Sequence, residues 1–270
     1  MEILGFMCAM LVGISLGALG MGGSILTIPI MVYLMHVSPV DATGYSLFVV
    51  GITSAVGVAK YIRKDLVDLQ TAIVFALPSV LAVFLTRTFL VHSIPDPVFS
   101  TSSFHLSKDL FIMLFFALLM LVIAFNMLRN HEVEEPVLKE FHWTDFLWLV
   151  LLGLASGLLT GLAGIGGGFI IIPALVLLAK TPIKMSVGTS LLIISINAFI
   201  GFMGELIVRH DAINYPFLFL FATFSVAGIF IGFRWASRVV STVLKKIFGW
   251  LVLIIGVSIF IKEIFFTAFH

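Results

Sequence analysis

The chain contains one glycine-rich pattern twice, 144 residues apart, and both copies lie among long apolar segments. Residues 13–29 read GISLGALGMGGSILTIP, and residues 157–173 read GLLTGLAGIGGGFIIIP. Seven positions coincide without a gap: Gly13 with Gly157, Gly17 with Gly161, Gly20 with Gly164, Gly22 with Gly166, Gly23 with Gly167, Ile28 with Ile172, and Pro29 with Pro173. A repeat at this spacing predicts two similar halves. Glycine-interrupted apolar segments at corresponding places in two halves indicate the binding site of a secondary transporter.

The composition predicts a protein that is surrounded by lipid. Hydrophobic residues make up 61% of the chain and charged residues 11%, and the mean hydropathy is +1.21. Soluble domains carry about 25% charged residues, whereas apolar runs of about 20 residues satisfy their backbone groups internally as membrane helices. The sequence therefore predicts an all-α integral membrane protein in a lipid bilayer. The net charge of +1 suggests no nucleic-acid partner. The single cysteine, Cys8, excludes an intramolecular disulfide and a cysteine-rich metal site.

Hydropathy predicts five apolar segments in each half. In the first half they are 3–20, 24–36, 42–60, 69–91 and 108–128, and in the second half they are 145–163, 168–180, 185–208, 214–235 and 245–266. A charged stretch with Pro136 separates the halves and has the composition of a surface linker. The chain is therefore divided into a first transmembrane repeat (1–128), a cytoplasmic linker (129–144) and a second transmembrane repeat (145–270).

The first two segments of each half are predicted to form a broken hairpin. As one helix, residues 3–36 would be about 51 Å long at about 1.5 Å per residue, which exceeds a hydrocarbon core of about 30 Å. The glycines between the two segments permit a sharp reversal of the chain. We therefore expect a re-entrant or broken hairpin in each half rather than two standard spans.

The distribution of basic residues predicts how the two halves are oriented. If each hairpin enters and leaves on one side, eleven of the fifteen Lys and Arg residues share one face: Lys60, Arg63, Lys64, Arg129, Lys139, Lys180, Lys184, Arg234, Arg238, Lys245 and Lys246. If each hairpin formed one span, the basic residues would divide seven against eight. The positive-inside rule favours the first arrangement. The repeats then have inverted topology, both termini are external, and the glycine breaks meet near the midplane.

The glycine breaks are the first candidate binding site. At each break a short helix begins, and its first turn presents N–H groups without intrahelical partners at a positive dipole end. Without a side chain in the way, an oxyanion can approach the backbone closely. The candidate residues are Gly22, Gly23 and Ser24 in the first half and Gly166, Gly167 and Gly168 in the second. Four earlier glycines are assigned to packing, because small residues four apart let membrane helices touch. They are Gly13, Gly17, Gly157 and Gly161.

A polar stripe on the third segment of each half is the second candidate site. Its spacing places the polar residues on one helical face. Ser46, Thr53 and Gly57 form the stripe in the first half, and their counterparts are Ser190, Asn197 and Gly201. Asn197 places an amide near the middle of a membrane segment, where it needs partners in protein or in a wet cavity. Substrate binding and interhelical hydrogen bonding are both open for Asn197, and the other three polar residues are predicted to bind substrate.

Ionisable residues are expected at segment ends rather than inside the membrane. Glu205 and Arg209 are spaced as an i, i+4 pair at a solvated boundary, and Arg87 is expected to extend toward the outer interface. The sequence contains no HExxH motif, and no buried acid–base chain or histidine relay is evident. We therefore expect no enzymatic activity, no metal site and no cofactor.

The duplicated glycine motif, with Pro29 and Pro173 and then GYS (44–46) and GTS (188–190), resembles the TauE/SafE family of sulfite and organosulfonate permeases. The resemblance covers essentially the whole chain. The second copy, GLAGIGGGFIIIPAL, is closer to the family pattern, whereas the first has Ser24 in place of the third glycine. The resemblance implies a multi-pass inner-membrane transporter of small sulfur-containing anions such as sulfite, thiosulfate or organosulfonates.

The expected function is movement of a small oxyanion by alternating access between inverted halves. An anion channel that uses the same site, and a non-transporting scaffold of a sulfur-metabolism complex, are the alternatives. The membrane potential, worth about 2.3 kcal/mol per charge per 100 mV, favours outward movement of an anion. Because no coupling relay is evident, uncoupled export is the expected mode. The oligomeric state is left open.

Overall fold

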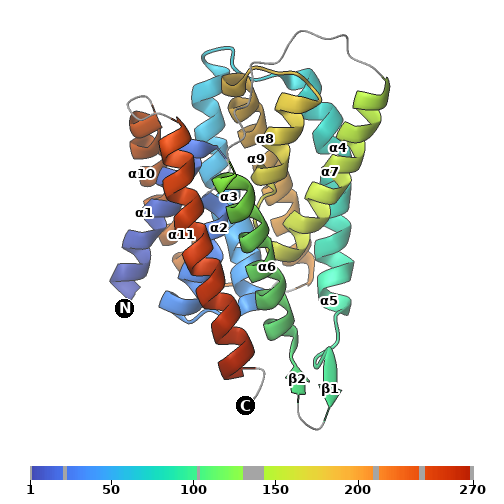
Figure 1. The fold of residues 1–270 in the computed structure, drawn as a ribbon, viewed down its shortest axis with the longest axis vertical. Helices are drawn as coiled ribbons and strands as arrows, with labels where there is room; N and C mark the ends of the chain where they lie inside the picture. The colour runs from blue at the N-terminus through green and yellow to red at the C-terminus, as the bar shows by residue number, and fades with distance from the viewer. Residues whose placement is uncertain are drawn as a thin grey trace.

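The computed structural model of the chain is a bundle of helices (Figure 1). It describes residues 2–20, 23–101, 104–129, 143–208, 213–236 and 241–267. Within these ranges, seven helices are long and apolar enough to cross a membrane, and the predicted all-α architecture is confirmed. Predictions that concern Gly22, Arg209 and linker residues 130–142 lie outside the described residues.

The two halves have the same order of helices. The first half contains α1 (Glu2–Leu19), α2 (Gly23–Pro29), the π-helical turn η1 (Ile30–Leu34), α3 (Pro39–Ile62), α4 (Leu69–Leu85), the π-helical turn η2 (Thr86–Leu90), α5 (Val91–Ser93), the strands β1 (Phe99–Thr101) and β2 (Phe104–Leu106), and α6 (Lys108–Leu128). The second half contains α7 (Trp143–Ala163), α8 (Gly168–Leu177), α9 (Ile183–Val208), α10 (Tyr215–Ala236), α11 (Ser241–Lys262) and the π-helical turn η4 (Glu263–Thr267). The strands form a short antiparallel hairpin in the polar loop before α6, with Phe99 opposite Leu106.

Polar side chains define where several of these helices begin. Ser38 precedes α3, and its Oγ accepts a hydrogen bond from the Asp41 N–H at 3.2 Å. Asp68 precedes α4, and its Oδ1 accepts one from the Thr71 N–H at 3.1 Å. Such caps satisfy N–H groups that the first turn of a helix leaves unpaired. The helix starts therefore follow from the local sequence.

Each hairpin starts and finishes at the same end of the bundle. In the first half, a Cβ at Gly5 in α1 would lie 2.7 Å from Cγ of Met35, which follows η1. In the second half, Lys180 Nζ lies 3.2 Å from Asp145 Oδ2, so the start of α7 is joined to the segment after α8. In Figure 1, α1 begins at the end that carries the marked N-terminus, whereas α7 begins at the opposite end. The two hairpins thus enter the bundle from opposite ends.

The halves interlock through equivalent helix pairs. The first helix of each half packs along the fourth helix of the other: α1 on α10, and α7 on α4. The third helices, α3 and α9, pack on each other, and so do the fifth helices, α6 and α11. This exchange makes one continuous core between the halves.

Glycines make the contacts between exchanged helices close. A Cβ at Gly13 would collide with the carbonyl oxygen of Ser225 on α10, and a Cβ at Gly157 would collide with that of Ser79 on α4. The glycines one turn further along make similar contacts with the same two helices: Gly17 and Gly161. The predicted packing role of these four glycines is confirmed, because any larger residue would push the helices apart.

Candidate functional site

The second glycine break, residues 164–167, depends on backbone conformations that favour glycine. Gly164, Gly166 and Gly167 have φ angles of 66°, 74° and 71°. This left-handed region is disfavoured for residues that carry a Cβ. The break ends α7 and makes Gly167 the N-cap of α8. In the first break, Gly20 has a φ of 70°. The expectation that the glycines end the helix is confirmed.

Two hydroxyl groups of α7 face the second break. A Cβ at Gly167 would lie 2.8 Å from Thr160 Oγ1 and would collide with Ser156 Oγ. Both side chains are fully buried, and within the described ranges neither hydroxyl has a hydrogen-bond partner. The first N–H groups of α8, a helix of ten residues, also lack intrahelical partners. The second break therefore holds unused hydrogen-bond donors beside the positive end of a helix.

The first break is packed differently. Its helix α2 has only seven residues before the π-helical turn η1. Gly23 and Ser24 are buried, and a Cβ at Gly23 would collide with the carbonyl oxygen of Val12 on α1. Thr27 Oγ1 donates to the Gly23 carbonyl at 3.4 Å, so it is satisfied by its own helix. Of the predicted residues in this break, Gly23 thus serves close packing with α1.

The serines of the polar stripe bridge the two halves at the breaks. Ser46 Oγ on α3 donates to the Gly164 carbonyl of the second break at 2.7 Å. Ser190 Oγ on α9 lies 3.5 Å from the Gly20 carbonyl of the first break and donates to the Val187 carbonyl at 2.8 Å. Each third helix therefore contacts the break of the other half, which is how the fold brings the two predicted sites together.

The two breaks also approach each other directly. A Cβ at Gly166 would lie 3.9 Å from Ser24 Cβ, and one at Gly20 would lie 3.4 Å from Ile172 Cδ1. All of these residues are buried or nearly so. The glycine motifs, 144 residues apart in the sequence, therefore meet inside the bundle.

Thr53 and Asn197 lie away from the breaks, against the fourth helices. Thr53 Oγ1 lies 3.0 Å from Ser225 Oγ on α10. Asn197 Nδ2 donates to Ser79 Oγ on α4 at 2.6 Å, and its Oδ1 is buried without a hydrogen-bond partner in the described part of the chain. Both side chains thus make the interhelical bonds that were the alternative for Asn197. The backbone of Ser79 also packs against Gly157 of α7.

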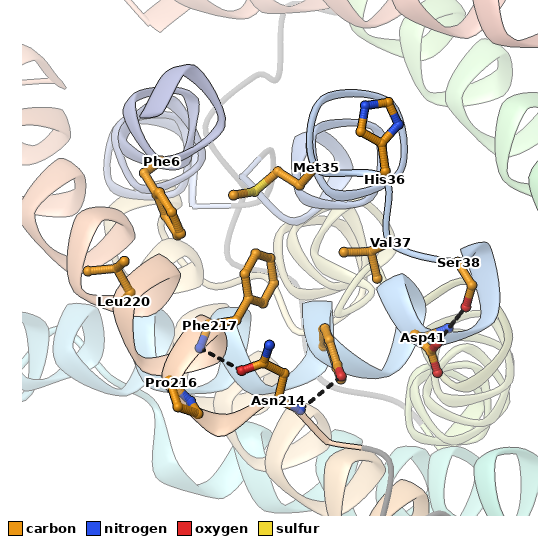
Figure 2. Close-up of a pocket in the computed structure, with 11 residues that line it drawn as sticks. Phe6, Met35, His36, Val37, Ser38, Asp41, Asn214, Pro216, Phe217 and Leu220 are labelled. Carbon is orange, nitrogen blue, oxygen red and sulfur yellow. Dashed lines mark hydrogen bonds between the residues drawn. The ribbon is translucent and has the colours of Figure 1, made fainter. Parts of the chain in front are cut away.

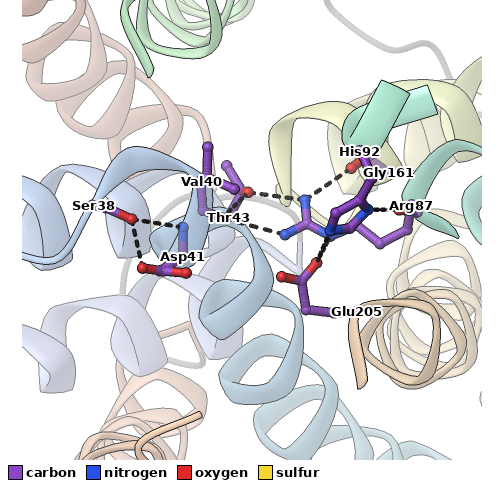
Figure 3. Close-up of polar contacts among 8 residues, drawn as sticks. All are labelled: Ser38, Val40, Asp41, Thr43, Arg87, His92, Gly161 and Glu205. Atoms are coloured by element: carbon purple, nitrogen blue, oxygen red, sulfur yellow. Dashed lines mark hydrogen bonds and ion pairs between the residues drawn. The ribbon is translucent and has the colours of Figure 1, made fainter. Parts of the chain in front are cut away.

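A buried ion pair lies beside the second break (Figure 3). Arg87 on η2 is fully buried, and its Nε lies 2.6 Å from Oε2 of Glu205 on α9, which is 3% exposed. Its Nη1 donates to Thr43 Oγ1 at 2.9 Å and to the Gly161 carbonyl at 3.3 Å, and its Nη2 donates to the Val40 carbonyl at 3.3 Å. The guanidinium therefore joins the start of α3, the end of α7 and α9.

This ion pair corrects three expectations from the sequence. Arg87 does not extend to the interface, Glu205 is not at a solvated boundary, and a buried carboxylate is present among the described helices. The spacing to Arg209 favoured a local pair, whereas the tertiary structure places Glu205 beside a helix 118 residues away in the sequence. A usable signal was an arginine inside an apolar segment, since a buried charge needs a partner. In the structure Gly44 makes room for this arginine, because a Cβ there would lie 2.8 Å from Arg87 Nη2.

An open pocket of about 600 Å³ lies at the end of the bundle where the first hairpin enters (Figure 2). Its polar lining includes Asp41 and Tyr45 of α3 and Asn214 before α10. A second pocket of about 380 Å³ shares Ser38 with it and is also lined by Val40. The carbonyl of Val40, which lines the smaller pocket, accepts a hydrogen bond from Arg87 Nη2 at 3.3 Å, so this pocket borders the ion pair.

The fold and the site define a class of protein. Helices long enough to span a bilayer pack with two broken hairpins, and the breaks meet among buried polar groups. Irregular backbone at membrane depth is tolerated only where it is enclosed by protein or lines a cavity, and such sites are typical of multi-pass membrane transporters.

The chain belongs to the sulfite exporter TauE/SafE family, whose model matches residues 5–259. It is 30% identical over 260 residues to a probable membrane transporter protein of Xylella fastidiosa (strain Temecula1), with 93% of this chain and 91% of the relative covered. It is 26% identical over 210 residues to the probable membrane transporter protein MJ0441 of Methanocaldococcus jannaschii, with 76% and 72% covered. No solved structure matches it. The chain is thus a membrane transporter and not an enzyme.

Proposed function

We propose that this transporter carries small sulfur-containing oxyanions, such as sulfite, thiosulfate or organosulfonates, through the inner membrane by alternating access. The observation that carries the proposal is the pair of buried, unpartnered hydroxyls, Ser156 and Thr160, which face the N-terminus of α8 at Gly167. Hydroxyl and backbone donors at a positive helix end match the several oxygens of a compact oxyanion. Sulfur itself enters the proposal through the description of the family.

The charge beside this site supports an anionic substrate. Arg87 donates to the carbonyl of Gly161, the residue after Thr160. A guanidinium presents five donors in a fixed planar geometry that suits oxyanions. The site therefore offers an anion the neutral hydroxyl donors of Ser156 and Thr160 and, next to them, the guanidinium of Arg87. Arg87 is paired with Glu205, and we propose that it can exchange this carboxylate for the anion.

The two breaks are proposed to contribute unequally. The second break supplies the donors, from Ser156, Thr160 and the first turn of α8. The first break, with its seven-residue helix and self-bonded Thr27, closes the site from the other half. Ser46 and Ser190 hold the breaks together and so position the donors without being free to bind substrate.

The halves are proposed to cross the membrane in opposite senses, with both termini external. The charge distribution and the opposite entry of the two hairpins support this orientation. In a Cys8→Ser background, Ser93→Cys should react with an impermeant thiol reagent in intact cells, whereas Lys64→Cys should react only after the cells are opened. The reverse labelling pattern would contradict the orientation.

We also propose that the anion moves outward, but for a different physical reason than the one expected from the sequence. Uncoupled export driven by the membrane potential was expected because no buried carboxylate was evident, and Glu205 removes that premise. We propose instead that the anion moves along its own concentration gradient, and therefore outward when it accumulates inside the cell.

Transport by the purified protein in liposomes tests this function. Radiolabelled thiosulfate should enter with saturable kinetics, and unlabelled thiosulfate on the opposite side should accelerate its exchange. Sulfite and sulfoacetate should compete, whereas nitrate should compete weakly because its three oxygens are coplanar with the nitrogen, while those of the sulfur oxyanions form a pyramid. Flux without saturation or counterflow would indicate a channel, and the absence of any flux would indicate a scaffold.

A further inference from the structure

The ion pair beside the second break includes a third ionisable group. His92 lies on α5, one turn beyond Arg87, and its Nδ1 lies 2.8 Å from the Arg87 carbonyl (Figure 3). Its Nε2 lies 4.0 Å from the same Glu205 oxygen that pairs with Arg87. Within the described residues this Nε2 is buried and has no hydrogen-bond partner. Because only a protonated Nδ1 can bond a carbonyl, the neutral ring directs its Nε2 lone pair toward the carboxylate.

The charges of this cluster limit what the adjacent site can bind. Arg87 and Glu205 together are neutral, and the other acceptors around the guanidinium are neutral oxygens of Thr43, Gly161 and Val40. An anion that entered beside them would leave its negative charge uncompensated in a buried region, which is costly. One proton on Glu205 would lower that excess by one charge. It would also release the Arg87 Nε–H, which Glu205 now accepts.

A proton can reach this carboxylate from one end of the bundle. The His92 side chain is 18% exposed, while that of Glu205 is 4% exposed. His92 lies two residues before Ile94, which lines the smaller pocket. The histidine therefore connects a wet surface to the buried carboxylate, and its Nε2 is the atom that would receive and pass on the proton.

We propose that Glu205, reached through His92, is a proton-binding site linked to the anion site at the second break. Binding of the anion displaces Glu205 from Arg87, and Glu205 takes up one proton, so that Arg87 pairs with the anion. This inference rests on the proposed function. Binding of anion and proton is then mutually favourable, because linkage between two sites is reciprocal.

The other charged groups near the cluster lie at the start of α6. Lys108 acts electrostatically on His92, and Asp109 Oδ1 accepts from the N–H of Val40, whose carbonyl contacts Arg87. Arg209, four residues after Glu205 in the sequence, lies outside the described residues. Among the described groups, Glu205 is thus the carboxylate in direct contact with Arg87.

The proposal predicts a proton count that can be measured directly. Titration calorimetry of the detergent-solubilised protein with thiosulfate, in two buffers of different ionisation enthalpy, gives the number of protons taken up. Thiosulfate is used because its own charge is constant in the neutral range. We expect uptake of one proton per thiosulfate, and an affinity that falls by up to about tenfold per pH unit as the pH rises.

Variants locate the proton. Glu205→Gln keeps a group that can bond Arg87 but cannot titrate, so thiosulfate should bind without proton uptake and with no dependence on pH. The control is Asp145→Asn, which breaks the ion pair to Lys180 at the mouth of the second hairpin and should leave the proton count unchanged. His92→Asn should keep the proton count, because its amide can still donate to the Arg87 carbonyl, but should slow acidification of the liposome interior during thiosulfate uptake.

The wild-type protein alone can overturn the inference, even if the variants fold poorly. Thiosulfate binding with no proton uptake in either buffer would refute the coupled site while leaving the anion site intact. An unchanged proton count in folded Glu205→Gln would also refute it. If the wild-type protein binds none of the sulfur oxyanions, the proposed function fails first and this inference fails with it.

Discussion

One end of the bundle is joined by an ion pair and the other by two aromatic rings, although the helices involved are equivalent. Arg87 pairs with Glu205 at 2.6 Å near the end that carries the termini. At the opposite end the corresponding residues are Phe233 on α10 and Tyr61 on α3, whose ring centroids lie 5.9 Å apart. Glu205 follows Tyr61 by the 144 residues of the glycine repeat. Phe233 follows Arg87 by 146, the same offset that relates Ser79 and Ser225, which meet Gly157 and Gly13 on the fourth helices. A charged contact in one half thus corresponds to an apolar contact in the other.

The framework around the two contacts is the same. The glycine of the GYS or GTS motif leaves room for each: a Cβ at Gly44 would lie 2.8 Å from Arg87 Nη2, and one at Gly188 would lie 2.9 Å from Tyr61 Cβ. The residue after each glycine holds the loop before a fourth helix. Tyr45 Oη accepts from the Asn214 N–H at 3.0 Å, and Thr189 Oγ1 accepts from the Asp68 N–H at 2.9 Å.

The comparison shows that the repeat preserved helix packing while the chemistry diverged. The charges and the unpartnered hydroxyls gather at the second break. The positions that correspond to Ser156 and Thr160 in the first half are Val12 and Leu16, which are buried and apolar. An asymmetric substrate site can therefore arise within a nearly symmetric framework, because packing depends on small residues and the site depends on a few polar substitutions.

The largest expected effect comes from replacing the Arg87–Glu205 ion pair by the two aromatic residues found in the other half. Arg87→Met leaves Glu205 buried without its partner and should destabilise the protein by about 3–5 kcal/mol. The double variant Arg87→Phe/Glu205→Tyr copies the contact between Phe233 and Tyr61 and should recover most of that stability. It should still not bind thiosulfate. Thermal unfolding in detergent and calorimetry measure the two effects, and anion binding by the folded double variant would contradict the assigned role of the charges.

A methyl group at the second break should abolish transport. Gly167→Ala forces a residue with a Cβ into a left-handed conformation, at a cost of about 1–2 kcal/mol. Its Cβ would also fill the space in front of Ser156 and Thr160. The measurement is thiosulfate flux per folded molecule in liposomes. Gly23→Ala is the comparison from the first break, and it should lower the yield of folded protein because its Cβ meets the Val12 backbone.

Removing the unpartnered hydroxyls should weaken binding without weakening the fold. Ser156→Ala and Thr160→Val should each reduce the binding free energy of thiosulfate by about 1.5–3 kcal/mol if a charge-assisted hydrogen bond is lost. Because neither hydroxyl has a partner in the described chain, the melting temperature should stay the same or rise. Ser15→Ala and Thr27→Val remove hydroxyls that bond their own helix, and calorimetry should find their affinities unchanged. Equal losses in both sets would contradict the asymmetry.

The two serines that bridge the halves should differ slightly in their contribution to stability. Ser46→Ala loses a 2.7 Å hydrogen bond to Gly164 and leaves that buried carbonyl unsatisfied, so it should cost about 1–2 kcal/mol. Ser190→Ala should cost less, because its contact with Gly20 is 3.5 Å long and its shorter bond is to its own helix. Unfolding in detergent measures both, and a larger loss for Ser190→Ala would reverse the predicted order.

The apolar segments and their breaks could be read from the sequence because each depends on local properties. Runs of apolar residues specify helices through their length, and contiguous glycines such as Gly166 and Gly167 end a helix because no other residue adopts their backbone angles easily. The packing glycines were also predictable, since their four-residue spacing is itself a local pattern. The predicted segments accordingly correspond one to one with the helices and hairpin arms that the structure contains.

The chemistry around the breaks was decided by the tertiary structure. Arg87 and Glu205 are 118 residues apart, and only the exchange of helices between the halves places one beside the other. Ser156 and Thr160 have no distinctive sequence pattern, and their importance comes from facing Gly167 without a partner. Hydropathy and spacing describe what each segment prefers by itself, whereas a buried charge or an unsatisfied hydroxyl is defined by its neighbours, which the sequence specifies only through the complete fold.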